Sequence, residues 1–189
     1  MKILCAEYNQ NAEVAVVSVG DDVLLRNNGD FYIPDFTQEV SCVPQLVVRI
    51  SKLGKSVGER FASRYFEEIG VGIRFYADSL EEKLSAQGLP TVMAASFDSS
   101  CAISSMVKWE KEKGAVYEMF VNEKCITAGE VDSLPFSIEK LIAFSSDFHT
   151  LKIGDFLFCG HRHRFRNLRR GDCLQMTLNG VKMLDFRIS

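Results

Sequence analysis

Several features that mark whole classes of proteins are absent from this chain of 189 residues. No stretch approaches the roughly 18 consecutive apolar residues that a membrane-spanning helix needs. The start, MKILCAEYNQ, lacks the longer apolar segment and the cleavage site of a secretory signal. The formal net charge of −3 argues against a protein that coats nucleic acid or an anionic membrane.

Closely spaced cysteines are missing as well. The six cysteines are scattered, and no two of them form a CxxC pair. A zinc site or a disulfide framework would need tighter spacing, so the pattern indicates reduced and mostly buried thiols. No histidine spacing marks Cys42 or Cys159 as an activated nucleophile, and both are expected to be structural. Reduced thiols and the missing signal segment predict a cytoplasmic protein.

Proline is scarce too, with four in the whole chain, and no proline-rich or serine-rich linker divides it. Hydrophobic residues make up 47% of the composition and charged residues 25%, which is typical of a soluble globular domain. The length is enough to bury a proper core. We expect one domain over residues 1–189.

Capping patterns and apolar spacing predict three short helices. Ser56 and Glu59 form an S-x-x-E capping box ahead of aromatic residues on one face, and Ser79 and Glu82 repeat the pattern. The apolar spacing near the end of the chain predicts a third helix. The expected helices cover residues 56–69, 79–88 and 136–148.

Most of the remaining chain predicts β-strands joined by turns, because runs rich in Val, Ile and Phe are bounded by Gly, Asp and Asn. The expected strands cover residues 13–19, 23–25, 45–50, 71–77, 115–121, 125–129, 151–157 and 168–174. The last two share the pattern L-x-x-G-D-x-L, in which a glycine turns the chain and Asp155 or Asp172 caps the turn. We expect structural roles for both aspartates.

The order of short sequence blocks resembles that of a known family. The blocks are LLRNN with FYIPDF, QLVVRI, GVGI-x-F-x-A, GLP, SFDSS, FSIEKLIAF and TLKIGDFLFCG. Together they resemble the fumarylacetoacetate hydrolase family from about residue 20 to the end, and residues 1–20 resemble a shortened N-terminal lid. The resemblance implies a mixed, mostly β fold with a rolled sheet or compressed barrel and about three short helices. It also implies a homodimer.

The family resemblance implies a chemistry as well. Its members hydrolyse, decarboxylate or tautomerise dicarbonyl acids, with Mg²⁺ or Mn²⁺ acting as a Lewis acid on the developing enolate. Three carboxylate ligands are implied, and this chain has Val43, Gln45 and Arg74 at those positions. We therefore predict that the metal site is lost and that no cofactor binds.

Other functional elements of the family are altered too. The lid element keeps Tyr8, Asn9 and an acidic Glu13 but has no histidine. The lysine of the substrate loop is replaced by Ala95, whereas Asp98 matches the family's aspartate.

The segment FCGHRHRFRNLRRGD, residues 158–172, stands where the resemblance implies a substrate-binding G-T-P-x-G loop. Gly160 is kept, and His161 and Arg162 replace the threonine and proline. An H-x-H pair can bind zinc, but the surrounding arginines disfavour a cation. The arginines could instead contact nucleic acid, an acidic protein or a second subunit, or form a solvated loop. Nucleic acid is not favoured, since the chain is acidic overall.

Arg74 supports a sharper hypothesis. A guanidinium in this place could hold a small carboxylate or phosphate bidentately. The candidate anion-binding residues are Arg74, Asp98, Gly160, His161 and Arg162. The simpler interpretation is that Arg74 forms a salt bridge with a nearby acid.

The sequence thus predicts a protein with the family fold that is a pseudoenzyme, with no catalytic residues and a role in binding a small anion or a partner. The alternative is an active Mg²⁺- or Mn²⁺-dependent hydrolase, decarboxylase or isomerase acting on an acylpyruvate, oxaloacetate or fumarylacetoacetate type of acid. A second alternative is a protein whose arginine-rich loop binds nucleic acid or an acidic partner.

Overall fold

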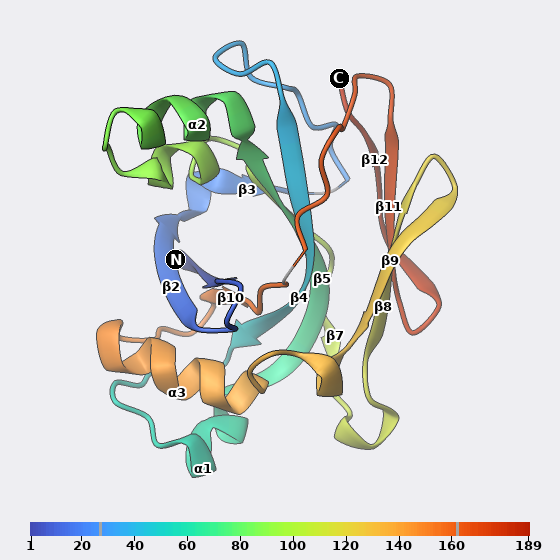
Figure 1. Cartoon of the computed structure of the whole chain (residues 1–189). Helices are drawn as coiled ribbons and strands as arrows, with labels where there is room; N and C mark the ends of the chain where they lie inside the picture. The colour runs from blue at the N-terminus through green and yellow to red at the C-terminus, as the bar shows by residue number, and fades with distance from the viewer. Residues whose placement is uncertain (27, 162) are drawn as a thin grey trace.

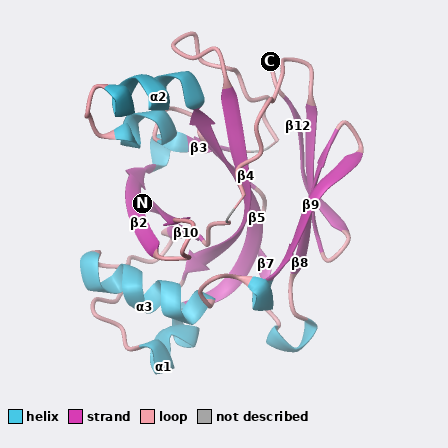
Figure 2. Cartoon of the chain, viewed as in Figure 1, coloured by secondary structure: helices cyan, strands magenta, loops and turns pink. Residues whose placement is uncertain are grey.

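The computed structural model describes residues 1–26, 28–161 and 163–189 of the chain. Two β-sheets form the body of this part of the chain, and three α-helices pack around the larger sheet (Figures 1 and 2). The expected class, mostly β with about three short helices, is confirmed. Among the described residues, no helix is both long and apolar enough to cross a membrane.

The larger sheet is curled, so that its strands partly enclose one of its faces (Figure 1). It contains β1 (Lys2–Tyr8), β2 (Val14–Gly20), β3 (Leu24–Leu25), β4 (Val40–Ile50), β5 (Phe66–Ala77), β6 (Cys101–Ile103), β7 (Val107–Lys108) and β10 (Phe156–Phe158). The strand order is β2-β1-β10-β4-β5-β6-β3, and β7 pairs with β5. β1 runs parallel to β10, whereas β4 and β5 form a long antiparallel pair.

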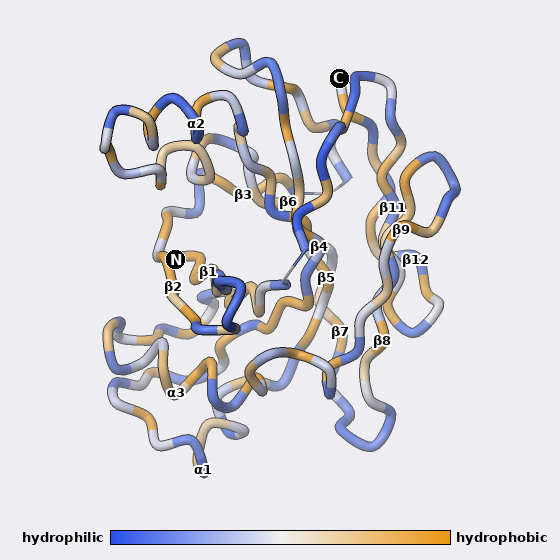
Figure 3. Tube along the Cα trace, in the orientation of Figure 1, coloured by the Kyte–Doolittle hydropathy of each residue, from blue (hydrophilic) through white to orange (hydrophobic). Residues whose placement is uncertain are grey.

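The smaller sheet is antiparallel throughout and lies against β5 (Figure 1). It contains β8 (Val116–Val121), β9 (Lys124–Glu130), β11 (Cys173–Leu178) and β12 (Val181–Arg187), in the order β12-β11-β8-β9. Phe186 of β12 meets Phe75 of β5 edge to face, with ring centroids 6.3 Å apart. Hydrophobic residues lie along the strands of both sheets (Figure 3).

β4 and β5 separate the core into two parts, because successive side chains of a strand point to opposite faces. On the outer face, Leu46 and Ile73 belong to a large cluster that includes the smaller sheet. On the inner face, Val47, Ile3 and Phe158 belong to a second, smaller cluster. With both faces covered, β4 and β5 are buried along almost their whole length.

The first helix is shorter than the predicted 56–69. α1 covers Glu59–Ala62, and β5 already begins at Phe66. Phe66 pairs with Ile50 of β4, so the ladder between β4 and β5 takes the residues that would continue the helix. The predicted capping box is not formed, since the N-cap is Gly58 and makes no side-chain hydrogen bond.

The other two helices agree closely with the predicted 79–88 and 136–148. They are α2 (Asp78–Ala86) and α3 (Ile138–Phe148), and α1 packs against α3. The Ser137 side chain caps α3 by accepting a backbone hydrogen bond from its first turn. Four strands, β1, β6, β7 and β12, had no counterpart in the sequence prediction. The strands predicted over 151–157 and 168–174 start late, since β10 begins only at Phe156 and β11 only at Cys173.

Both Gly-Asp turns of the L-x-x-G-D-x-L pattern have the expected structural role. Gly154 and Gly171 adopt φ values of 88° and 92°, which favour glycine. Asp155 and Asp172 each accept the backbone N–H three residues earlier, in both cases at 2.8 Å. Asp155 is fully buried and also accepts the backbone N–H of Lys2 at 3.0 Å, while the Lys2 ammonium forms an ion pair with it. This aspartate therefore fixes the start of β1 beside β10.

Replacing Asp155 with alanine should lower the free energy of unfolding by about 3 kcal/mol, the usual cost of breaking a buried ion pair. Asp172→Ala removes the same turn cap from a half-buried site and should cost about 1 kcal/mol. Denaturant unfolding of the two variants measures both losses. Equal losses would contradict the anchoring role of Asp155.

Candidate active site

The inner face of the larger sheet changes from apolar to polar along its strands. Ile3 on β1 and Val47 on β4 belong to the inner apolar cluster. Alternate residues share a face, so Glu7 on β1 and Gln45 on β4 extend this face. Arg74 on β5 joins them, because its guanidinium forms an ion pair with Glu7. We call Glu7, Gln45 and Arg74 the polar layer.

Arg74 is the central charge of this layer, and its side chain is 0% exposed. Its Nη1 pairs with the Glu7 carboxylate, and its Nη2 donates to the Ala95 carbonyl at 3.3 Å. The guanidinium also lies over the Tyr76 ring, with Cζ 5.2 Å from the ring centroid. Burial alone would lower the pKa of Arg74, but the groups around it, Glu7 among them, raise it above its ordinary value. The guanidinium therefore stays charged, and it forms the salt bridge that the simpler interpretation of Arg74 expected.

Gln45 connects the polar layer to the loop that follows β10. Its Oε1 accepts the backbone N–H of Gly160 at 2.7 Å. Gly160 has a φ of 75°, and a Cβ at this position would lie 2.5 Å from the Tyr8 ring and 2.6 Å from the Ala6 carbonyl oxygen. The Tyr8 hydroxyl donates to the Cys159 carbonyl at 3.0 Å. Only glycine fits here, so the end of β1 and this loop are held together closely.

A hollow of about 120 Å³ opens above the polar layer. Its lining includes one carboxylate, one imidazole, one guanidinium and two phenols, from Glu7, His161, Arg164, Tyr8 and Tyr76. The remaining lining residues are Ala6 and Val43. Groups that can accept and donate protons therefore meet in one small space.

His161 is half-buried, and its Nδ1 lies 3.1 Å from the backbone nitrogen of His163. Burial lowers the pKa of His161, although a backbone hydrogen bond to His163 opposes this effect. The imidazole is therefore neutral at pH 7. Nδ1 also lies 3.3 Å from the His163 carbonyl oxygen. We assign Nδ1 as the acceptor in the shorter contact with the His163 N–H, which puts the proton of the neutral ring on Nε2.

The arginine-rich loop is tied to α2 by ion pairs. Arg164 pairs with Glu81 and with the buried Asp78, the latter at 3.2 Å, and stacks on the Tyr76 ring with Cζ 3.8 Å from the centroid. Nη1 of Arg166 lies 3.9 Å from Oδ1 of Asp78. Arg164 is thus neutralised within the chain and Arg166 is drawn toward the same aspartate, which weakens the hypothesis of a nucleic-acid site.

The structure brings several predicted site residues together and separates one. Arg74 and Gly160 belong to the polar layer or contact it, and His161 lines the hollow. Asp98 is exposed and does not line the hollow. Arg162 lies outside the described residues.

Sequence analysis missed Glu7, Tyr76 and Arg164. The signal for Glu7 was available in the alternation of KILCAEY, where apolar residues on one face end in a carboxylate. Tyr76 lies on the predicted strand 71–77 and Arg164 in the basic loop, and no local pattern brings these two together. Their side chains meet only because the loop after β10 runs beside β4, where Phe165 forms a bridge with Cys42.

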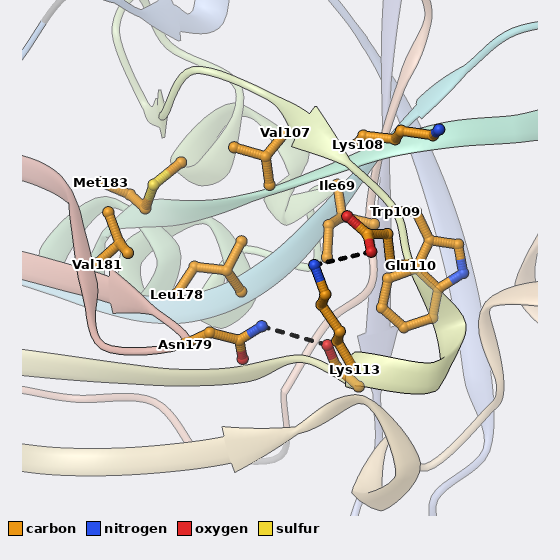
Figure 4. A pocket seen from close by; sticks show the side chains of 11 residues that line it. Ile69, Val107, Lys108, Trp109, Glu110, Lys113, Leu178, Asn179, Val181 and Met183 are labelled. Carbon is orange, nitrogen blue, oxygen red and sulfur yellow. Dashed lines mark hydrogen bonds and ion pairs between the residues drawn. The ribbon is translucent and has the colours of Figure 1, made fainter.

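A larger hollow of about 300 Å³ lies elsewhere, between the β7 region and the β11–β12 hairpin (Figure 4). Its walls are mainly apolar, and several of its polar side chains already have an ion-pair or hydrogen-bond partner. Lys113 pairs with Glu110 at 2.8 Å, and Asn179 donates to a backbone carbonyl at 3.3 Å. It shares no lining residue with the hollow of Glu7 and offers no comparable set of proton-transfer groups.

A family model described as fumarylacetoacetate (FAA) hydrolase C-terminal matches residues 6–189. The chain belongs to this family. The expected resemblance is therefore confirmed, and the fold of family members is confirmed by solved structures. The fumarylpyruvate hydrolase of Pseudomonas aeruginosa, solved with Mn²⁺ and pyruvate, superposes with a TM-score of 0.88 at 18% identity, covering 100% of this chain and 89% of that chain.

Other relatives in the family have named activities. The mitochondrial oxaloacetate tautomerase FAHD1 of Bos taurus is 26% identical, over 82% of this chain and 72% of its own length. The oxaloacetate tautomerase YcgM of Escherichia coli is 26% identical, over 72% of this chain and 64% of its own length.

The donor set does not fit the divalent ion that the family implies. Val43 offers no ligand atom, and the Gln45 oxygen is engaged by Gly160. Arg74 places a fixed positive charge beside the single carboxylate, Glu7. Within the described part of the chain, no three His, Cys, Asp or Glu side chains gather closely enough to hold a metal ion. The protein's own residues would have to supply the chemistry of this hollow.

Glu7→Ala should lower the free energy of unfolding by about 3 kcal/mol, because it leaves the buried Arg74 charge without its anion. This is the lower end of the usual range, since the Glu7 side chain is 40% exposed. Adding Arg74→Met should recover most of the loss, and denaturant unfolding of single and double variants measures it. Glu68→Ala, which breaks the exposed pair with Arg49, should cost under about 1 kcal/mol. Additive losses at Glu7 and Arg74 would contradict the ion pair.

The lowered pKa of His161 predicts a pH dependence of stability. The folded state binds this proton less readily than the unfolded state, so the free energy of unfolding should fall as pH drops below about 6.5. His161→Gln should remove this component, and His149→Gln serves as a control outside the hollow. Urea unfolding between pH 5 and pH 8 tests it, and an unchanged pH profile in His161→Gln would refute the assignment.

Proposed function

We propose that this chain moves a proton within a small dicarbonyl acid, and specifically that it interconverts the keto and enol forms of oxaloacetate or a close analogue. The observation that carries the proposal is the pairing of Glu7 and His161 in one hollow. Relatives named as oxaloacetate tautomerases support the substrate class. They favour the enzymatic alternative over the pseudoenzyme that the altered ligand positions predicted.

The chemistry needs one group that takes a proton from carbon and one that gives a proton to oxygen. Glu7 is the proton acceptor, because its carboxylate lines the hollow and is held in place by Arg74. The neutral His161 is the donor, since its Nε2–H is not used by the hydrogen bond to His163. The C–H bond breaks toward Glu7 while the O–H bond forms from His161 Nε2. A proton then passes from the Glu7 carboxyl to the His161 imidazolate through solvent, which restores both groups, and no electron is gained or lost.

The hollow also suits the size and charge of such an acid. Its volume of about 120 Å³ is well below the roughly 300 to 1,000 Å³ of pockets that take drug-sized ligands. Only a small ligand fits this space. Arg164 on its wall and Arg74 beneath it supply positive charge that attracts a carboxylate.

The homodimer and the cytoplasmic location stay predictions. The Bos taurus relative is named as a mitochondrial protein. A hydrolase or decarboxylase activity on the same class of acid would use the same hollow, and assays with an acylpyruvate and with oxaloacetate as substrate for CO₂ release distinguish these activities from tautomerisation.

The proposed activity is measured by the loss of enol-oxaloacetate absorbance in the presence of EDTA. The wild-type protein should accelerate the decay, and Glu7→Gln should slow it by about 10²- to 10⁴-fold, the usual contribution of a general base. Glutamine at this position can still accept a hydrogen bond from Arg74, so the fold should persist. Glu59→Gln, the same change at an exposed position on α1, should keep the wild-type rate.

Two results would sink this proposal. The first is a wild-type rate equal to that of buffer, which would restore the pseudoenzyme hypothesis. The second is an unchanged rate in Glu7→Gln. Activity that appears only with added Mg²⁺ or Mn²⁺ would instead show a metal site built from other residues, as the metal-dependent alternative holds.

A further inference from the structure

Two buried nitrogen donors in the polar layer have no hydrogen-bond partner among the described residues. They are Nε of Arg74 and Nε2 of Gln45. Both side chains are almost completely buried. Burying a donor without an acceptor is costly, and folded proteins rarely leave one unpaired. Two such donors in one layer need an explanation.

The ladder between β4 and β5 puts these donors on one face. Gln45 stands opposite Gly72 and Arg74 stands opposite Val43, so the two side chains are diagonal neighbours on adjacent strands. The arrangement follows from the strand register and needs no movement of the backbone.

Both donors are also fixed in direction. The Gln45 amide is oriented by its acceptor bond from the Gly160 N–H at 2.7 Å. The Arg74 guanidinium is held by Glu7 through Nη1 and by the Ala95 carbonyl through Nη2. Neither bond uses Arg74 Nε or Gln45 Nε2, so both donors stay available to a further acceptor while Arg74 keeps its ion pair with Glu7.

We propose that Arg74 Nε and Gln45 Nε2 together bind a carboxylate oxygen of a small acid, which makes the polar layer an anion site that works without a divalent cation. Two chemical properties define the acid that this site would bind. Its oxygen accepts two N–H bonds, and its negative charge is drawn by a guanidinium that would repel a metal ion. The inference deepens the proposed function, on which it rests for the identity of the ligand as a substrate.

The test uses oxalate, a small dicarboxylate with no C–H proton to transfer, added to the full chain in EDTA. Isothermal titration should show saturable binding to the wild-type protein. Gln45→Glu keeps an acceptor for the Gly160 N–H but removes the donor and adds a negative charge, so it should weaken binding at least about tenfold. Gln87→Glu, at the exposed end of α2, should bind as the wild type does.

A second measurement needs no variant and does not depend on whether Gln45→Glu folds. On addition of oxalate, the ¹⁵N–¹H signals of the Gln45 side-chain amide and of Arg74 Nε should shift, whereas those of Gln87 and Arg49 should not. Signals at Gln45 and Arg74 that stay in place would overturn the proposal. So would oxalate binding that requires Mn²⁺, or equal binding to Gln45→Glu.

The outcomes also separate this inference from the proposed function. Oxalate binding through these two donors, without any acceleration of enol decay, would leave the anion site in place and remove the enzymatic activity. Enol turnover that depends on Glu7, without oxalate binding in EDTA, would keep the activity and overturn the anion site.

Discussion

Eleven residue pairs join β4 to β5, from Val40 opposite Ala77 to Ile50 opposite Phe66, and both strands are covered on their two faces. The rest of the molecule depends on this ladder. Its outer face carries the smaller sheet, and its inner face carries the apolar cluster and the polar layer. A slip of one residue would exchange the faces and push Arg74 into the apolar core between the sheets. The buried guanidinium and the apolar residues beside it therefore specify the same register.

Charge balance inside the chain decides what the candidate site can do. Arg74 is buried and neutralised by Glu7, and Arg164 is drawn to α2 by Asp78 and Glu81. These two arginines thus act as structural charges around one small hollow. The hollow keeps a carboxylate, a neutral imidazole and positive charge in its surroundings. This combination suits proton transfer on a small anion better than it suits binding of an extended partner.

The chain shares the fold of its family but differs from it in the charges of the polar layer. The chain matches the family model over residues 6–189 and shares the fold of an enzyme solved with Mn²⁺ and pyruvate. Its own polar layer, however, carries a fixed cation and, among the described residues, two donors without an acceptor, where the family has carboxylates. A guanidinium and a divalent ion both attract carboxylate oxygens, but only the guanidinium is covalently part of the chain and directional in its bonds. The same class of acid can therefore be held by different means.

The sequence by itself determined the family, the mostly β class, the extent of α2 and α3, both Gly-Asp turns, and the unusual residues at 43, 45 and 74. These features depend on local patterns or on blocks in order along the chain, which a sequence displays directly. The tertiary structure alone decided that the helix predicted over 56–69 ends early, because pairing with β4 outweighs helix propensity at Phe66. It also decided that Glu7 meets Arg74 and that Arg164 meets Glu81. These partners lie far apart in the sequence, and they meet only once strand order and register are set, so no local pattern could reveal them.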